Sequence, residues 1–505
     1  MVRRTGLAID PSRREPLYHQ IFEAIAARIR AGTFPAGHRL PPTRSLATEL
    51  GAHRNTVVRA YESLEAAGFV TSTVGRGTFV ASVRREAPRA EPARDATPGM
   101  PWASLLSRAT SAEPLARFDR LQANYAAEPR DAIQLARLSP SADLLPDELL
   151  RRCFEHVFRT LGPRALGYAP RDGLPRLRGL IAEDLRAQGV PAQAEGVLVT
   201  NGSQQAIDLV VRLLVDPGDA FLVDAATYTG ATSALLNAGA RAIAVPSDGD
   251  GPSLAFLERH GRMGAKGFYA IPSSHNPTGV TLSAARRELL VAWAQRAGVP
   301  LVEDDYAGDI QLTNEPLPPA LRALDRDVVY IGTFSKKLIP ALRVGFILCP
   351  EPLRAPMTSL KHALDIGTSG LMQHALAEFL ERGYLRAHLG RVVPEYRARR
   401  DALAAGLAAH LPRGMRFRLP DQGLLIWLPL PPGLSADAVA QEARRRGVLV
   451  GPSSLFTVGA DELQGLRLTF SAEPPERLLE GARRLGRAIA ALSPTRGASE
   501  ASGLV

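Results

Sequence analysis

The sequence is poor in residue types that several classes of protein require. Of its 505 residues only two are cysteines, Cys153 and Cys349, and no CxxC pair exists. A disulfide framework and a zinc site are therefore both disfavoured. No uninterrupted apolar run is long enough to cross a bilayer, and the N-terminus, charged from Arg3 onward, lacks the apolar core of a signal peptide. These absences predict a reduced, cytoplasmic location.

Lysine is also scarce. The chain contains Lys266, Lys336, Lys337 and Lys361, so arginine supplies nearly all of the positive charge and the formal net charge of +10. This charge suits an acidic partner such as DNA, although net charge alone is not specific. The length exceeds that of one compact domain, and the 45% hydrophobic content supports a large core. Both predict two or three domains.

The first eighty residues predict three short helices. Residues 17–30 carry isoleucines at helical spacing. A second helix would begin at Thr43, whose hydroxyl can cap it, and would end in a tight turn at Gly51. A third would open at Asn55 or Thr56. Two short helices joined by a glycine turn are typical of a helix-turn-helix.

Two strands at 69–73 and 77–80, around Gly75 and Arg76, would follow as a hairpin wing. Between Arg39 and Arg59 the arginines outnumber the single acid, Glu49. The first residues of the later helix would point into the major groove of DNA, and its dipole favours a nearby phosphate. The alternative is a small helical domain with ordinary surface arginines.

The stretches RLPPTRSLATELG, RNTVVRAYESLEAAGFV and GRGTFV resemble the winged-helix domain of GntR-type transcriptional regulators. The resemblance implies that Arg44, Arg54, Thr56 and the wing glycines contact DNA. His53 stands where a small serine is usual, and Arg76 where serine is common in the wing, so both could alter operator preference. The candidate DNA-binding residues are Arg39, Thr43, Arg44, Arg54, Asn55, Thr56, Arg59, Gly75, Arg76 and Gly77.

Changes in composition divide the chain. A DNA-binding domain is predicted over residues 14–82. Residues 83–130 are rich in proline, alanine, arginine and glutamate and read as a linker. A large domain is expected at 131–493, with a small α+β subdomain toward its C-terminus, and residues 494–505 are expected to form a disordered tail.

In the large domain, β-like runs alternate with helical patterns, which predicts an α/β fold with a mainly parallel sheet. Such sheets bind ligands at the carboxyl ends of their strands. Gly202, Tyr228, Asn276, Asp304 and Lys336 each come just after a predicted strand. The sequence therefore predicts that they converge on one site. Taken singly, Asp304, Tyr306 and Asn276 also suit buried structural roles, the stretch at Gly202 suits an ordinary strand-to-helix turn, and Lys336 suits a solvated loop.

Together these residues match the needs of an aldehyde cofactor. The amine of Lys336 can form a Schiff base with it, and Asp304 can keep a pyridine ring protonated as an electron sink. Tyr306 and Asn276 can donate hydrogen bonds to a phenolate oxygen, and Tyr228 can stack on the ring. A phosphate would be held by hydroxyl, amide and guanidinium groups: Ser203, Gln204, Thr333, Ser335 and Arg343.

The motifs TNGSQQAIDL, SHNPTG, EDDY, GTFSKKLIPALRVGF and GLRLTFS resemble, in this order, the fold-type-I aminotransferases that use pyridoxal 5′-phosphate. Behind a GntR-like winged helix, this looks like a MocR-type transcriptional regulator. The resemblance implies an internal aldimine at Lys336, a substrate carboxylate on Arg467, and a homodimer in which Tyr168 reaches the neighbouring subunit's phosphate. Because EDDY is one residue shorter than the aminotransferase form, the pyridine contact could be Asp304 or Asp305.

Three functions stay open from the sequence. The first is a regulator that binds double-stranded DNA and senses an amino-acid or amine effector by aldimine exchange at Lys336, without catalytic turnover as its output. The second is an aminotransferase with an accessory DNA-binding module, and HNPTG is enzyme-like enough for residual transaminase activity. The third, a regulator sensing pyridoxal phosphate itself, would leave Arg467 without a carboxylate to bind.

Overall fold

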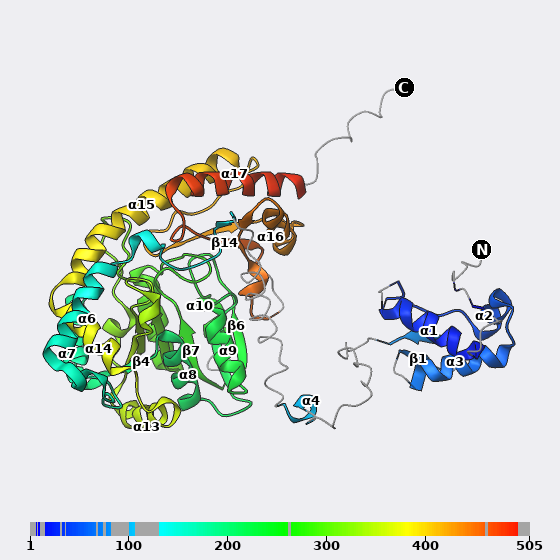
Figure 1. Cartoon of the computed structure of the whole chain (residues 1–505), viewed down its shortest axis with the longest axis horizontal. Coiled ribbons are helices and arrows are strands. Elements are labelled where there is room, and N and C mark those ends of the chain that lie inside the picture. The colour runs from blue at the N-terminus through cyan, green and yellow to red at the C-terminus, as the bar shows by residue number, and fades with distance from the viewer. Residues whose placement is uncertain are drawn as a thin grey trace. The chain divides into compact units, whose positions relative to one another are not determined.

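The computed structural model describes residues 7, 9–10, 16–30, 33–35, 37–66, 69–73, 77–81, 100, 102–106, 131–260, 264–459 and 463–492. The chain divides into two compact units, Met1–Ser104 and Leu105–Val505, and each is described by itself (Figure 1). Most of the predicted linker and the whole predicted tail lie outside the described residues.

The first unit contains α1 (Leu17–Arg30), α2 (Thr43–Leu50), α3 (Arg54–Ala66), β1 (Val70–Thr73) and β2 (Gly77–Val80). The strands pair antiparallel, with Val70 opposite Val80. Apolar side chains at helical spacing meet in one core, which includes Ile21, Ile25, Leu46, Val57 and Leu64. The predicted helix-turn-helix and wing are therefore both present.

The turn between α2 and α3 depends on Gly51. Its φ of 63° is left-handed, and its N–H donates to the carbonyl of Ala47, an arrangement that glycine adopts without strain. The predicted cap at Thr43 is wrong, because Pro42 occupies the cap position and no side chain caps this helix. At the start of α3, the Nδ1 atom of His53 accepts from the N–H of Asn55 at 3.3 Å.

The second unit is built on a seven-stranded sheet in the order β4-β10-β9-β8-β7-β5-β6. The strands from β9 to β6 pair in parallel, whereas β10 runs antiparallel to both of its neighbours. The mainly parallel prediction is confirmed, with one reversed strand. The strands are β4 (Val197–Thr200), β5 (Ala220–Asp224), β6 (Arg241–Val245), β7 (Ala265–Ala270), β8 (Leu301–Asp305), β9 (Val329–Thr333) and β10 (Gly345–Leu348).

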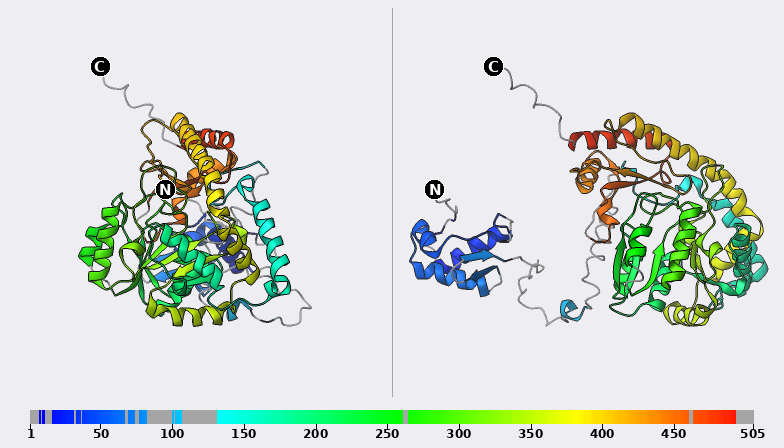
Figure 2. Two further views of the ribbon diagram at one scale, coloured as in Figure 1. Left: turned by 90° about the vertical axis from the view of Figure 1, so that its left-hand side faces the viewer. Right: turned by 180° about the vertical axis from the view of Figure 1, so that it is seen from behind.

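Helices cover both faces of this sheet (Figure 2). Successive strand residues point to opposite faces, so Leu198 packs with α8 and α9, whereas Val197 and Val199 pack with α6, α7 and α14. A third cluster joins α10, α11 and α12. These helices are α6 (Asp147–Leu161), α7 (Pro175–Ala187), α8 (Ser203–Leu214), α9 (Thr229–Asn237), α10 (Leu254–His260), α11 (Ala284–Ala297), α12 (Leu321–Leu324) and α14 (Gly370–Glu381).

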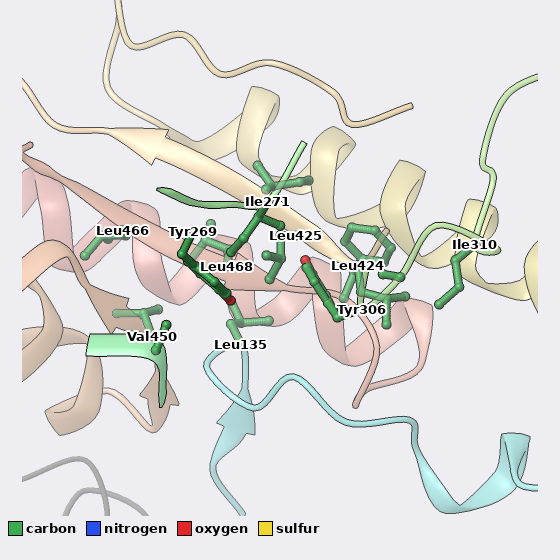
Figure 3. Packing of buried hydrophobic residues seen from close by; sticks show 14 of the residues in the cluster. Leu135, Tyr269, Ile271, Tyr306, Ile310, Leu424, Leu425, Val450, Leu466 and Leu468 are labelled. Atoms are coloured by element: carbon green, nitrogen blue, oxygen red, sulfur yellow. The ribbon is translucent and has the colours of Figure 1, made fainter. Parts of the chain in front are cut away.

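The C-terminal part forms a smaller α+β layer. Its antiparallel sheet has the order β11-β14-β13, and β12 pairs in parallel with β3. Leu425, Leu466 and Leu468 of this layer pack near Tyr269 and Tyr306 (Figure 3). The elements are β3 (Ile133–Gln134), α15 (Tyr384–His410), β11 (Leu425–Pro429), α16 (Ala436–Arg445), β12 (Val448–Leu449), β13 (Gly451–Pro452), β14 (Gly465–Thr469) and α17 (Pro475–Leu492). Helix α13 (Arg354–Asp365) packs instead against α8, beside the large sheet.

Both cysteines are buried free thiols. Across the part of the chain that the structure describes, the helices are too short or too polar to span a membrane.

We expect Gly51→Val to destabilise the turn between α2 and α3 by about 1–3 kcal/mol, because a β-branched residue is strained at positive φ. No atom lies within 4 Å of the position of an added Cβ, so the cost would be backbone strain alone. Hydrogen exchange of the α2 and α3 amides in the full chain measures it. Gly51→Asn is the matched control, since asparagine tolerates this conformation, and equal exchange in both variants would contradict the account.

Candidate functional site

A cavity of about 270 Å³ opens at the carboxyl ends of β7, β8 and β9. It brings together all but one of the residues predicted to hold the cofactor, together with Arg467. The exception is Tyr168, which is 90% exposed and does not line this cavity. The lining residues are Leu138, Ser203, Gln204, Tyr228, Thr229, Ile271, Asn276, Asp304, Tyr306, Thr333, Ser335, Lys336, Arg343, Phe456 and Arg467.

Lys336 follows β9 and enters the cavity from the turn after that strand. Its Nζ atom donates to the carbonyl of Leu138 at 2.7 Å. Burial, together with the positive charges of Arg467 and Arg343, lowers the pKa of Lys336 to about 8. A neutral amine is the nucleophilic form of lysine, so this environment prepares it for attack on a carbonyl.

Asp304 is the acid that faces the cavity, and it is 2% exposed. Burial raises its pKa to about 7, against the opposing effect of Tyr269, whose hydroxyl donates to Oδ2 at 2.5 Å. Oδ1 is buried and has no hydrogen-bond partner among the described residues. Asp305 points to the other side of the strand, where its carboxylate accepts from Tyr330 at 2.6 Å. The geometry therefore favours Asp304 over Asp305 as the acid that would contact the pyridine nitrogen.

Three more polar side chains line the cavity. The hydroxyl of Tyr306 donates to the carbonyl of Ser274 at 2.7 Å, and burial raises its pKa. Asn276 Oδ1 accepts from Nη1 of Arg467 at 3.0 Å. The hydroxyl of Tyr228 donates to Oε1 of Gln204 at 3.1 Å.

The opposite end of the cavity suits an anion. Helix α8 starts at Ser203, so its free backbone N–H groups open beside the cavity. Gly202 has a φ of 80°, and a Cβ there would lie 2.5 Å from Nη2 of Arg343. Arg343 itself has a left-handed φ of 50°, a strained conformation typical of functional positions. Thr333 Oγ1 donates to Ser335 Oγ at 3.1 Å.

Arg467 lies on β14 and is mostly buried. Besides Asn276, it donates through Nη2 to the carbonyl of Ala136 at 2.8 Å. Its guanidinium carbon stands 4.6 Å from the ring centroid of Phe456, within the range of a cation–π interaction. Two hydrogen bonds and an aromatic ring thus hold the guanidinium at the cavity wall.

Sequence reasoning missed several neighbours. Tyr269, Leu138, Thr229, Ile271 and Phe456 lie in or beside the site without belonging to a polar motif. Alternation along β7 gave a usable signal for Tyr269, since it shares a face with Ile271. Leu138 and Phe456 come from segments far apart in sequence, and only the tertiary fold brings them here.

In the first unit, Arg39, Arg44, Arg54, Asn55 and Arg59 are exposed, while Thr43 and Thr56 are partly buried. Gly77 has a φ of 112° and packs closely against Arg39. The guanidinium carbon of Arg59 lies 4.1 Å from the ring centroid of Tyr18, which orients this side chain. The predicted residues Gly75 and Arg76 lie outside the described part of the chain.

Two protein families match this chain, one over each of the two units. Residues 17–80 match the family described as bacterial regulatory proteins, gntR family. Residues 144–485 match the family described as aminotransferase class I and II.

Individual relatives agree with this order of parts. The chain is 33% identical over 494 residues to the probable rhizopine catabolism regulatory protein MocR of Rhizobium meliloti, covering 96% of each. It is 29% identical to the transcriptional regulator TauR of Rhodobacter capsulatus, covering 95% of this chain and 98% of that protein. The α-aminoadipate aminotransferase LysN of Thermus thermophilus, solved with N-(5′-phosphopyridoxyl)-L-leucine, matches 78% of this chain and 99% of its own with a TM-score of 0.71 and 31% identity.

Fold and families thus define a GntR-type DNA-binding unit joined to a fold-type-I aminotransferase-like unit. This combination is the architecture of the MocR-type transcriptional regulators, and the chain belongs to that family. The family and its structural relatives indicate pyridoxal 5′-phosphate as the cofactor. The cavity fits it, because the unpartnered Oδ1 of Asp304 offers an acceptor for the ring nitrogen and the start of α8 offers donors for the phosphate.

We expect Tyr269→Phe to weaken cofactor binding about tenfold at neutral pH, since a hydrogen bond to a charged group is lost. The hydroxyl favours the ionised form of Asp304, so its loss raises the pKa of that carboxyl further above its usual range. The deficit should therefore be larger at pH 6 and shrink as the pH rises above 8. Cofactor titrations at several pH values measure this.

The control is Tyr330→Phe, which removes the same kind of hydrogen bond from Asp305, outside the cavity. It should leave the affinity for the cofactor nearly unchanged. Equal affinities of the Tyr269→Phe variant and the parent at every pH would remove Asp304 from the assigned role.

Proposed function

We propose that this regulator senses a small amino-acid or amine effector by aldimine exchange at Lys336 and transmits the result to DNA through its winged helix. The observation that carries the proposal is the meeting of Lys336, Asp304 and Arg467 in one cavity, with the lysine pKa lowered to about 8. When bound, the cofactor supplies an aldehyde and an electron-accepting ring.

The residues of this chain would share the work of holding it. Lys336 would provide the amine, Asp304 would accept from the ring nitrogen, and Tyr306 and Asn276 would donate to the ring oxygen. Tyr228 would stack on the ring. The phosphate would be held by Ser203, Gln204, Thr333, Ser335 and Arg343. The guanidinium of Arg343 donates to the carbonyl of Asn201 at 3.2 Å and so braces the turn before α8.

We propose that Arg467 binds the carboxylate of the effector. Its two terminal nitrogens donate to Asn276 Oδ1 and to the carbonyl of Ala136. A carboxylate from an effector would offer a bidentate, charged acceptor in place of these neutral ones. That exchange of contacts also changes the environment of Asn276. A ligand shifts a protein's state only through such a difference between states.

The assembly we propose is a cytoplasmic homodimer. Tyr168 is almost fully exposed and does not line the cavity of its own chain, which supports a role at the phosphate of the neighbouring subunit. Each subunit then brings one winged helix, with Arg44, Arg54 and Thr56 facing the duplex and the hairpin of β1 and β2 serving as the wing. A pair of half-sites is the matching operator.

A working aminotransferase is the second candidate. It is favoured by the likeness to LysN and by the complete set of polar residues in the cavity. Mixing the purified protein with amino acids and a 2-oxo acid distinguishes the two. Amino-group transfer at enzyme-like rates would make turnover the output. A regulator that senses only pyridoxal phosphate would leave Arg467 without an effector carboxylate.

We expect borohydride to fix the cofactor on Lys336 of the yellow protein. Lys337 is the internal control, since its amine is paired with Asp309 on the opposite side of the turn. Mass spectrometry of the reduced protein locates the adduct. An adduct on Lys337, or none on either lysine, would contradict the proposed chemistry.

We expect Arg54→Ala to lose about 1–3 kcal/mol of operator affinity if the guanidinium reads a base edge. Binding of the parent should also weaken steeply with salt, because phosphate contacts release counterions. Arg241→Ala, which changes an exposed arginine on β6 of the second unit, controls for the loss of one positive charge. Titration of a two-half-site duplex measures both, and unchanged affinity in Arg54→Ala would refute the recognition helix.

A further inference from the structure

A second cavity, of about 250 Å³, lies at the ends of β5, β6 and β7. Of the residues around it, only Ile271 also lines the cofactor cavity. Its wall is mostly apolar and includes Ala226, Pro246, Val280 and Leu282. A concave, mostly apolar space with a few placed polar groups is the usual form of a small-molecule site.

One carboxylate faces this space. Asp224 ends β5, and its side chain is 10% exposed. The Nε2 atom of His275 lies 3.3 Å from Oδ2 but forms no hydrogen bond, while Nδ1 is bonded to Thr278 Oγ1 at 2.8 Å. Within the described residues, the nearest group that could donate to the Asp224 carboxylate is this His275 imidazole, which pairs with it when protonated. No aligned hydrogen bond reaches the carboxylate from the described residues, so a ligand that brings a donor would stabilise it.

The other charged groups at the rim of this cavity do not neutralise the Asp224 carboxylate. Arg286 reaches the wall, where it donates to the carbonyl of Pro252 at 3.4 Å. The same guanidinium is paired with Asp248 at 2.8 Å, so the two charges offset each other. The carboxylate of Asp224 therefore remains as the charge that a ligand meets.

From these contacts we infer that the second cavity binds a small molecule with an apolar body and a protonated amine, which donates to Asp224. The loop that holds the site also reaches the cofactor cavity. His275 lines the second cavity, whereas its neighbour Asn276 lines the first and accepts from Arg467. A ligand in the second cavity would therefore lie beside His275, the neighbour in sequence of Asn276, which accepts a hydrogen bond from Arg467. The site itself is independent of the proposed chemistry at Lys336.

The test uses N,N-dimethylbenzylamine, a tertiary amine that cannot form a Schiff base with the cofactor. We expect saturable binding to the full chain by isothermal titration calorimetry. Benzyl methyl ether has a similar size without the charge, and it should bind at least tenfold more weakly. Equal binding of the two probes, or no saturable binding of the amine in the millimolar range, would overturn the inference.

Two variants locate the site. Asp224→Asn should weaken binding of the amine at least tenfold, whereas Asp208→Asn, which changes a carboxylate paired with Arg212 on α8, should not. Ala225→Phe should fill the cavity and abolish binding. If the amine binds unchanged in Asp224→Asn and Ala225→Phe, the site lies elsewhere. Failure of the proposed function would instead appear as a missing borohydride adduct on Lys336, with this titration unaffected.

Discussion

The structure depends on bringing an amine and a carboxylate into the same buried cavity without letting them form a direct pair. Burial disfavours both charges, lowering the pKa of Lys336 to about 8 and raising that of Asp304 to about 7. The parallel strands β8 and β9 set this arrangement, because their carboxyl ends lie side by side. Tyr269 donates a hydrogen bond to Asp304, and the carbonyl of Leu138 accepts one from Lys336, so each group has a separate partner.

The chain joins this cavity to a DNA-binding unit that folds around its own core. Arg467 connects the C-terminal layer to the cavity, since it extends from β14 to Asn276. Asn276, on the loop after β7, is therefore joined to β14 of the C-terminal layer by a hydrogen bond. The adjacent cavity beside Asp224 and His275 shares the same loop, so two ligands could act on one structural element.

Much of the candidate site was predictable from the sequence, because the residues proposed to bind the cofactor lie at or just after strand ends. Motifs such as SHNPTG and EDDY place Asn276 and Asp304 in loops or at strand ends, where parallel topology brings them together. The choice between Asp304 and Asp305 needed the pleat of β8 in three dimensions. Tyr269, Leu138 and Phe456 were missed, because apolar or aromatic residues in strands and loops carry no motif. The predicted helix cap at Thr43 is wrong, because Pro42 occupies the cap position in an extended conformation before α2.

The most direct test of the central claim is a comparison of Lys336→Ala with the parent in operator titrations and in a reporter assay with the effector. The lysine lies in a different unit from the recognition helix, so operator affinity should stay within about tenfold, or about 1.4 kcal/mol. The response to the effector should be lost, because no amine remains to exchange. A Lys336→Ala protein that still responds normally would show that the lysine is not the sensor.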